Sequence, residues 1–290
     1  MKFSSAQIKA FVSDSPTKNG LGDVITEWKV TPNWIARYTY IHGAIPENCR
    51  PTANKVKGEL SAKAVRRLKQ CINWLVYLSK PKRIYMKELN KYFTFKINFI
   101  TLTLSSAQCH SDREIKRRLL EPFLKVMRNK WKVVNYVWKA ETQANGNIHF
   151  HITADKFIHH AELRLVWNTI QENLGYVSRS NIADPNSTDI HAVKQVRNLA
   201  AYISKYISKN DSTRRKIEGK IWDCNRALKS ISVKSRREDV MKLVEQQIVN
   251  QGGEYIGERY MGLYFLGEGQ LNKLCIGKQV RTLVESHCNS

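Results

Sequence analysis

Two histidines, His149 and His151, stand one residue apart within an apolar run. On a β-strand, residues two apart project to the same face, so both imidazoles would point together while Phe150 faces the core. Imidazole is the commonest metal ligand among side chains. The pair alone does not define a metal site, because half-buried strands also carry histidines for structural reasons. A third ligand and a nucleophile would strengthen the interpretation.

The third ligand depends on how the histidine strand pairs with the preceding strand, predicted over 133–142. The dipeptide Asn145-Gly146 is typical of a two-residue hairpin turn. With that turn, Glu141 and Lys139 would face the core. Two buried charges without partners are costly, so the two-residue turn is disfavoured.

A three-residue loop over 144–146 solves this problem. If Gly146 is left-handed and forms a bulge, the pairing shifts by one residue. Glu141 then lies opposite His149, and the apolar residues of both strands share the core-facing side. The sequence therefore predicts a cluster of Glu141, His149 and His151 on the open face of a sheet.

A carboxylate and two imidazoles could hold a divalent cation on a phosphate oxygen. Mg²⁺ or Mn²⁺ suits this chemistry, and Zn²⁺ would fit the same ligands. The competing interpretation of Glu141, His149 and His151 is a hydrogen-bonded histidine pair beside a solvated carboxylate.

A second group with chemical potential lies in a predicted helix over 193–209. Tyr202 and Tyr206 are four residues apart and so share one flank of that helix, with Lys205 beside them. Tyrosines often occupy such a boundary for packing alone. Next to a metal cluster, however, a phenolate could attack a phosphodiester, and the resulting phosphotyrosyl ester would conserve the bond energy for rejoining.

The order of the predicted elements is that of a ferredoxin-like or RRM-like α+β fold with a central antiparallel sheet, helices on one face and the other face open. Three segments are expected: a mostly helical N-terminal extension, a central catalytic domain and a basic C-terminal extension, over 1–90, 91–210 and 211–290. Apolar spacing, caps and turn residues predict helices over 56–79, from Ser111 with a kink at Pro122, 159–174 and 193–209. The same signals predict strands over 92–104, 133–142, 148–153 and 188–192, and a hairpin over 252–269.

Composition indicates a polyanionic partner. The 290 residues include 48 Lys and Arg against 25 Asp and Glu, a formal charge of +23. Nucleic acid is the expected partner, although a basic soluble protein would look similar. Six cysteines without C-x-x-C spacing, no apolar run long enough for a membrane span and no signal-like start indicate the cytoplasm. The absence of a P-loop signature indicates that no ATPase is attached.

These motifs together resemble the HUH endonuclease superfamily, specifically the two-tyrosine rolling-circle replication initiators of single-stranded DNA phages and plasmids. The resemblance covers about residues 91–225. Its elements are Phe99–Leu104, the metal motif His149–His151 with Glu141, the nucleophile motif Tyr202-x-x-x-Tyr206, and Glu218–Cys224, which follows the domain.

The resemblance implies that the protein nicks origin DNA. One tyrosine would form a 5′-phosphotyrosine and leave a 3′-OH primer, and the strand would later be rejoined. Lys205 would steady the phosphate or lower the phenol pKa. A host helicase and polymerase in a bacterial cytoplasm would complete replication. Three alternatives stay open: a relaxase or transposase of the same superfamily, a non-catalytic RRM-like nucleic-acid binder, and a metal-dependent hydrolase that uses water.

Overall fold

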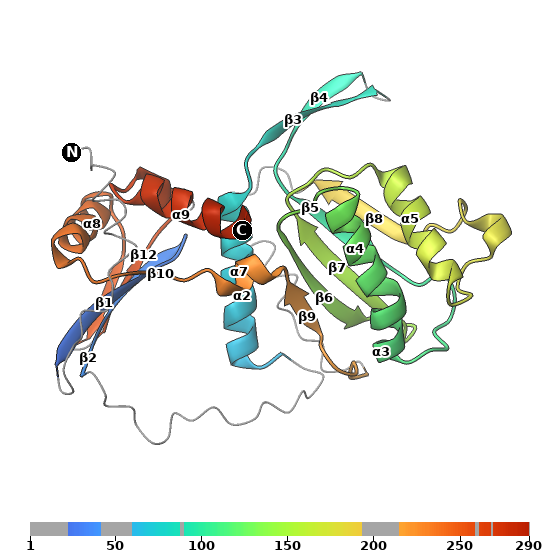
Figure 1. Ribbon diagram of the computed structural model, residues 1–290, viewed down its shortest axis with the longest axis horizontal. Helices are drawn as coiled ribbons and strands as arrows, with labels where there is room; N and C mark the ends of the chain where they lie inside the picture. The colour runs from blue at the N-terminus through green and yellow to red at the C-terminus, as the bar shows by residue number, and fades with distance from the viewer. Residues whose placement is uncertain are drawn as a thin grey trace. The chain divides into compact units, whose positions relative to one another are not determined.

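The computed structural model describes residues 23–41, 60–87, 90–192, 215–258, 261–267 and 269–289. The chain divides into two compact units. One unit comprises Lys55–Lys229, and the other combines Met1–Asn54 with Ser230–Ser290 (Figure 1). Both units are built around antiparallel sheets, so the α+β class with a central antiparallel sheet is confirmed.

The central sheet of the Lys55–Lys229 unit has the strand order β8-β5-β7-β6-β9, with every neighbouring pair antiparallel. Its strands are β5 (Asn98–Leu102), β6 (Tyr136–Thr142), β7 (Ile148–Ala154), β8 (Thr188–Ala192) and β9 (Trp222–Cys224). The first four, with the helices between them, form a β-α-β-β-α-β unit of the ferredoxin-like type. Strand β9 extends this sheet beyond β6.

The helices on one face begin and bend where the sequence predicts. Ser111 caps the first helix, because its hydroxyl accepts a hydrogen bond of 3.2 Å from the Glu114 N–H. A π-helical segment precedes Pro122, which lacks an N–H for the regular helical bond, so the helix deviates there. The helical segments are α3 (Asp112–Ile115), η3 (Lys116–Leu120), α4 (Glu121–Asn129), α5 (His160–Glu172) and the 3₁₀ turn η4 (Arg179–Asn181).

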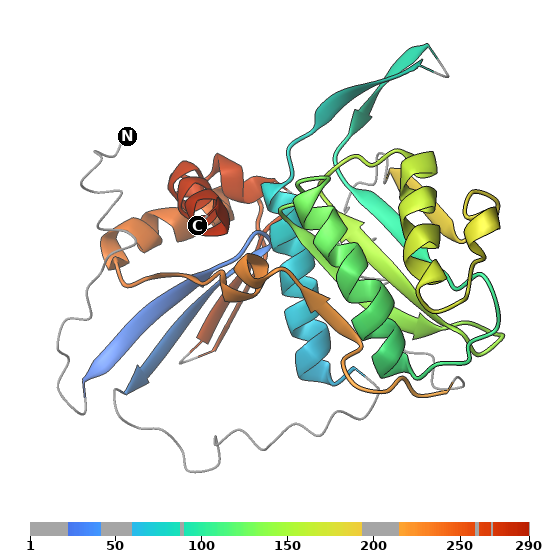
Figure 2. The same cartoon turned by 45° about the vertical axis from the view of Figure 1, so that its right-hand side comes forward.

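The core lies between the sheet and these helices, which cover one face in Figure 2. Phe150 of β7 is fully buried, and its ring lies 6.4 Å from that of Trp167 in α5. Trp167 in turn meets Phe123 of α4 edge-on, with 5.7 Å between ring centroids. The alternation of β7 therefore commits its apolar residues to this layer and its histidines to the opposite face.

The opposite face is open only in part, which corrects the prediction. Helix α2 (Ala62–Leu78) packs against β6 and β9. Its Cys71 Sγ lies 3.5 Å from Cys224 Sγ, and Cys224 stands opposite Val137 in the sheet. Val137 has the same strand parity as Glu141, so α2 covers one end of the face that carries the histidines. Leu68, Ile72 and Leu75 are buried because the helix has this surface to pack on.

The single strand predicted over 92–104 is two strands, and this prediction is wrong. Strand β4 (Lys91–Phe95) pairs with β3 (Lys82–Met86) in a separate two-stranded sheet, and β5 begins only at Asn98. The β-branched and aromatic residues run through both strands. Composition shows that such a run is extended but not where it changes partners.

The second unit contains a five-stranded sheet of order β10-β1-β2-β12-β11. Residues 24–41 form two of its strands, in contrast to the mostly helical N-terminal segment that the sequence predicts. The hairpin predicted over 252–269 is confirmed. The units also cut across the predicted limits at 90 and 210. The strands are β1 (Val24–Val30), β2 (Trp34–Ile41), β10 (Val233–Ser235), β11 (Tyr255–Glu258) and β12 (Met261–Phe265), and the helical segments are α8 (Glu238–Asn250), η5 (Gln270–Lys273) and α9 (Gly277–Asn289), with α7 (Arg226–Ser230) where the units join.

Two further observations concern membrane spans and thiols. None of the helices described here has the length and apolar character that crossing a membrane requires. The cysteines within the described residues are free thiols: Cys71, Cys109, Cys224, Cys275 and Cys288.

The turn between β6 and β7 has the predicted three-residue form. Gly146 is left-handed, with φ of 86°, and its N–H donates to the Gln143 carbonyl at 3.0 Å. The Gln143 N–H donates to the Asn147 carbonyl at 2.8 Å, which closes the loop. As a result Glu141 lies opposite His149, so the predicted register is confirmed.

Replacing Gly146 by alanine should destabilise the Lys55–Lys229 unit by about 1–2 kcal/mol, because an L-residue is strained at this positive φ. No atom lies within 4 Å of the added Cβ, so the cost would come from the backbone alone. Urea unfolding monitored by circular dichroism measures the change. Gly267→Ala, at a glycine without positive φ, is the control and should change stability by less than about 0.5 kcal/mol. Equal stabilities of G146A and the wild type would contradict the turn assignment.

Candidate metal centre

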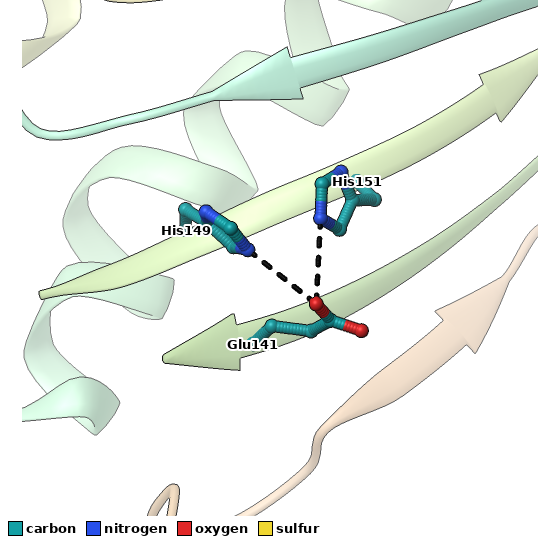
Figure 3. A group of neighbouring side chains, drawn as sticks. All are labelled: Glu141, His149 and His151. Carbon is teal, nitrogen blue, oxygen red and sulfur yellow. Dashed lines mark ion pairs between the residues drawn. The ribbon is translucent and has the colours of Figure 1, made fainter. Parts of the chain in front are cut away.

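The predicted cluster of Glu141, His149 and His151 is present on the face opposite α4 and α5. Figure 3 shows both imidazoles directed at one carboxylate oxygen. Glu141 Oε2 lies 3.6 Å from His149 Nε2 and 3.5 Å from His151 Nε2. One ligand atom from each residue can be chosen so that all lie within 4.8 Å of one another. The three donors therefore converge on one point.

Lys139 fixes the other oxygen of the carboxylate. Its ammonium group lies 2.5 Å from Glu141 Oε1, and its side chain is almost completely buried. Lys139 stands two residues before Glu141 on β6 and opposite His151, so register brings the groups together. Sequence reasoning placed Lys139 on this face but assigned it no role. The buried cation could have been inferred from its need for a partner charge.

These contacts keep Glu141 ionised. Burial alone would raise the pKa of its carboxyl group, but hydrogen bonds with His149, His151 and Lys139, together with the charge of Lys139, outweigh burial. The net effect holds the pKa of Glu141 far below its usual value. The cluster thus offers a carboxylate anion at neutral pH.

The neighbouring strand β5 orients His151. Thr101 stands opposite His151 in the sheet, and its Oγ1 lies 3.2 Å from His151 Nδ1. Phe99 stacks against the same imidazole, with 5.2 Å between ring centroids and 28° between planes. For Nε2 to offer a lone pair, Nδ1 must carry the hydrogen, which Thr101 Oγ1 can accept. The predicted first motif over 99–104 therefore supports the cluster rather than contributing a ligand.

The donor set fits a divalent cation. It supplies two imidazole nitrogens and one carboxylate oxygen, and each of the three side chains is partly exposed, so further ligands could approach from solvent. Mixed nitrogen and oxygen donors with open positions are compatible with Mg²⁺, Mn²⁺ or Zn²⁺. Glu141, His149 and His151 are the residues that would hold the ion.

The predicted nucleophile residues lie outside the described part of the chain. Tyr202, Lys205 and Tyr206 fall between Ala192, the last residue of β8, and Arg215, where the description resumes. The structure therefore shows only how the two ends of this segment are held. Ala192 stands opposite Asn98 at the end of β5.

Arg215 fixes the other end through a network that sequence reasoning missed. Its guanidinium binds the buried carboxylate of Asp112 through two hydrogen bonds of 2.8 and 2.9 Å. Its Nε also donates to the Gly146 carbonyl at 2.7 Å, and its own carbonyl accepts from the Thr142 hydroxyl at 3.0 Å. The chain that follows the tyrosines is thus tied to the turn that sets the register of the metal ligands.

Gln108 and Asn147 complete this network. The Gln108 side-chain oxygen accepts from the Ile148 N–H at 2.7 Å, and its nitrogen donates to Asp112 at 2.9 Å. The Asn147 amide in turn accepts from the Gln108 N–H and donates to the Ser106 carbonyl, both at 2.9 Å. Such long-range pairings carry no periodic signal, which is why they cannot be found in the sequence alone.

Comparison with known proteins places this segment in a family. Residues 97–211 match the family of the replication-associated protein ORF2. Through this segment the chain belongs to that family of replication-associated proteins, which confirms the family predicted from the motifs. The match spans β5 to β8 and includes Tyr202 and Tyr206. Comparisons with curated proteins and with solved structures gave no match.

Replacing Asp112 by asparagine should cost about 2 kcal/mol of stability at neutral pH, because the charged hydrogen bonds with Arg215 would no longer form. Burial alone would raise the pKa of Asp112, but bonds from Arg215, Gln108 and the Glu218 N–H lower it overall. A carboxyl group with a lowered pKa stabilises the fold fully above about pH 4 and loses this contribution as pH falls through its folded-state pKa.

The stability difference between wild type and D112N should therefore be largest at neutral pH and shrink in acid. Urea unfolding at a series of pH values measures it. Asp184→Asn, at an exposed carboxylate, is the matched control and should change stability by less than about 0.5 kcal/mol. A difference that does not vary with pH would contradict the assigned role of Asp112.

Proposed function

We propose that this chain is a replication initiator that nicks single-stranded origin DNA and later rejoins it, with a tyrosine as the nucleophile. The observation that carries the proposal is the convergence of Glu141, His149 and His151 within a segment of a replication-associated family. That segment also contains two tyrosines at helical spacing, Tyr202 and Tyr206.

The residues of the site would divide the chemistry between them. Glu141, His149 and His151 would hold a Mg²⁺ or Mn²⁺ ion. A bound divalent cation would withdraw charge from the scissile phosphate and favour attack on phosphorus. Lys139 would keep Glu141 ionised and oriented, because its ammonium group already occupies the second carboxylate oxygen.

A phenol of Tyr202 or Tyr206 would supply the nucleophile after losing its proton. A bond forms between the phenolic oxygen and phosphorus, and the bond from phosphorus to the 3′ oxygen breaks. The 3′ oxygen takes up a proton and becomes a 3′-OH that can prime synthesis, while the 5′ phosphate stays on the tyrosine. Lys205 would stabilise the phenolate or the phosphate.

Rejoining would reverse this step. The phosphotyrosyl ester keeps the energy of the phosphodiester bond, so a 3′-OH or the second tyrosine can displace the first without ATP. The partners in this proposal are origin DNA in single-stranded form and a helicase and polymerase from the host, since the sequence contains no P-loop signature. The expected setting is the cytoplasm of a bacterium that carries a phage or plasmid.

Incubation with labelled single-stranded DNA and Mn²⁺ should give an adduct that survives denaturing electrophoresis. Suitable probes are oligonucleotides that cover the DNA encoding the chain and its flanks. Replacing both Tyr202 and Tyr206 by phenylalanine should abolish the adduct, because no phenol remains to attack. The two single variants should show which phenol attacks first.

The matched control for this experiment is Tyr38→Phe, an exposed tyrosine in the other unit, which should form the adduct at the wild-type yield. An adduct that persists in the double variant, or cleavage without any adduct, would refute the tyrosine mechanism. Cleavage without an adduct would instead favour a metal-dependent hydrolase. DNA binding with neither adduct nor cleavage would favour a non-catalytic nucleic-acid binder.

Binding of Mn²⁺ should depend on both the ligands and the strand that orients them. His149→Ala should abolish specific binding, because it removes one of three donors. Thr101→Val should weaken binding by about tenfold, the usual effect of losing a partner that orients a ligand. The measurement is the electron paramagnetic resonance signal of free Mn²⁺ during titration of the full chain.

Thr103→Val provides the control, because Thr103 bonds to the Ser187 carbonyl and not to the cluster. It should leave Mn²⁺ affinity within about twofold of the wild type, since it removes no partner of a ligand. Unchanged Mn²⁺ affinity in H149A would overturn the proposed metal centre.

A further inference from the structure

Strands β3 and β4 form a ribbon that stands apart from the central sheet of their unit. They pair antiparallel from Lys82 opposite Phe95 to Met86 opposite Lys91. Among the described strands, neither pairs with any other. Figures 1 and 2 both show the ribbon projecting beyond the sheet that contains β5. An isolated two-stranded ribbon gains little from its own hydrogen bonds, so its retention calls for an explanation.

The inner face of the ribbon is anchored to the body of the unit. The rings of Phe93 and Phe95 meet Phe157, which follows β7, at centroid distances of 5.6 and 5.8 Å. Phe95 is completely buried, and Ile84 beside Phe93 is partly buried. The base of the ribbon is therefore held by packing, and its direction is fixed relative to β5.

The outer face is exposed along its whole length and is unusually aromatic. Tyr85 and Tyr92 lie opposite each other and are 45% and 61% exposed. Their rings are 5.0 Å apart, and the Arg83 guanidinium lies 4.5 Å from the centre of the Tyr92 ring. The Tyr85 hydroxyl bonds to the Asn90 side chain at 2.5 Å. Arginine and tyrosine held in place on an exposed surface are typical of binding interfaces.

The charge of the ribbon favours a polyanion. Residues 80–96 include six basic residues against one acidic residue, Glu88. Within the described residues, no acidic side chain forms an ion pair with Arg83, Lys87 or Lys91. The six basic residues are Lys80, Lys82, Arg83, Lys87, Lys91 and Lys96.

We propose that the β3–β4 ribbon binds double-stranded DNA in the major groove, next to the strand that the chain would nick. The major groove is about 12 Å wide and accepts a two-stranded ribbon. Arg83, Lys87 and Lys91 would contact phosphates along the groove, as would the exposed tyrosine hydroxyls. The location of the duplex beside the cleaved strand rests on the proposed function, because the ribbon leads directly into β5, which carries Thr101 beside His151.

The aromatic arrangement favours a duplex over a single strand. Proteins that bind single strands present separate aromatic faces on which successive bases stack. Here the Tyr92 ring is covered by Arg83 on one side and meets Tyr85 on another. The rings are therefore engaged with one another, and they stiffen the ribbon instead of offering free stacking surfaces.

The test compares DNA binding by the full chain and by the triple variant Arg83→Ala, Lys87→Ala and Lys91→Ala. The probes are a labelled duplex of arbitrary sequence and one of its single strands, followed by fluorescence anisotropy over a range of salt concentrations. Duplex affinity should fall about tenfold or more, and the salt slope should flatten by roughly three, because each substitution removes one cation from a phosphate. Single-strand affinity should stay within about twofold, since the ribbon is not its binding surface.

A matched control removes three exposed cations elsewhere: Arg117→Ala, Lys125→Ala and Lys278→Ala. This variant has the same net charge as the ribbon variant but an intact ribbon, so its duplex affinity should stay close to that of the wild type. The single variant Lys87→Glu, at an exposed position, guards against misfolding of the triple variant and should also weaken duplex binding. Equal losses for duplex and single strand, or equal effects of ribbon and control variants, would overturn the proposal.

The outcome is separable from that of the nicking proposal. If the chain forms no tyrosine adduct but the ribbon variant still loses duplex affinity, only the nicking proposal fails. If single strands form the adduct normally and the ribbon variant binds duplex as the wild type does, only the ribbon proposal fails.

Discussion

The site depends on the register between β6 and β7, which the turn over 143–147 sets. Because side chains alternate along a strand, a slip by one residue would turn Glu141 into the core and away from both histidines. The left-handed Gly146 lets the chain form a three-residue loop at this point. Charge supports the same register, because Glu141 and Lys139 neutralise each other only when both leave the core on the same face.

The same turn links the metal ligands to the segment that contains the candidate nucleophiles. Arg215, the first described residue after that segment, binds the Gly146 carbonyl and the buried carboxylate of Asp112. The turn is thus held from two sides, by the strands it joins and by the chain that returns from the tyrosines. An architecture of this kind ties the end of the nucleophile segment to the strand pair that would position the phosphate, which fits the proposed nicking reaction.

Much of the catalytic domain could be predicted because its signals are local. Polarity alternation along β6 and β7 decided the register, and the cap at Ser111 located the first helix. What could not be predicted depends on partners distant in the sequence. The run over 92–104 has one composition but two sheets, and α2 covers part of the histidine face through contacts that no pattern reveals. The pairing of Arg215 with Asp112 joins residues about one hundred positions apart for the same reason.

The central claim is that Glu141, His149 and His151 form one divalent metal site. Anomalous diffraction from crystals of the full chain grown with Mn²⁺ tests this most directly. The account predicts one strong anomalous peak in direct contact with the carboxylate of Glu141 and with both imidazoles, and no such peak in crystals of the His149→Ala variant. A cluster without an anomalous peak, while Mn²⁺ occupies a site elsewhere on the chain, would contradict the account.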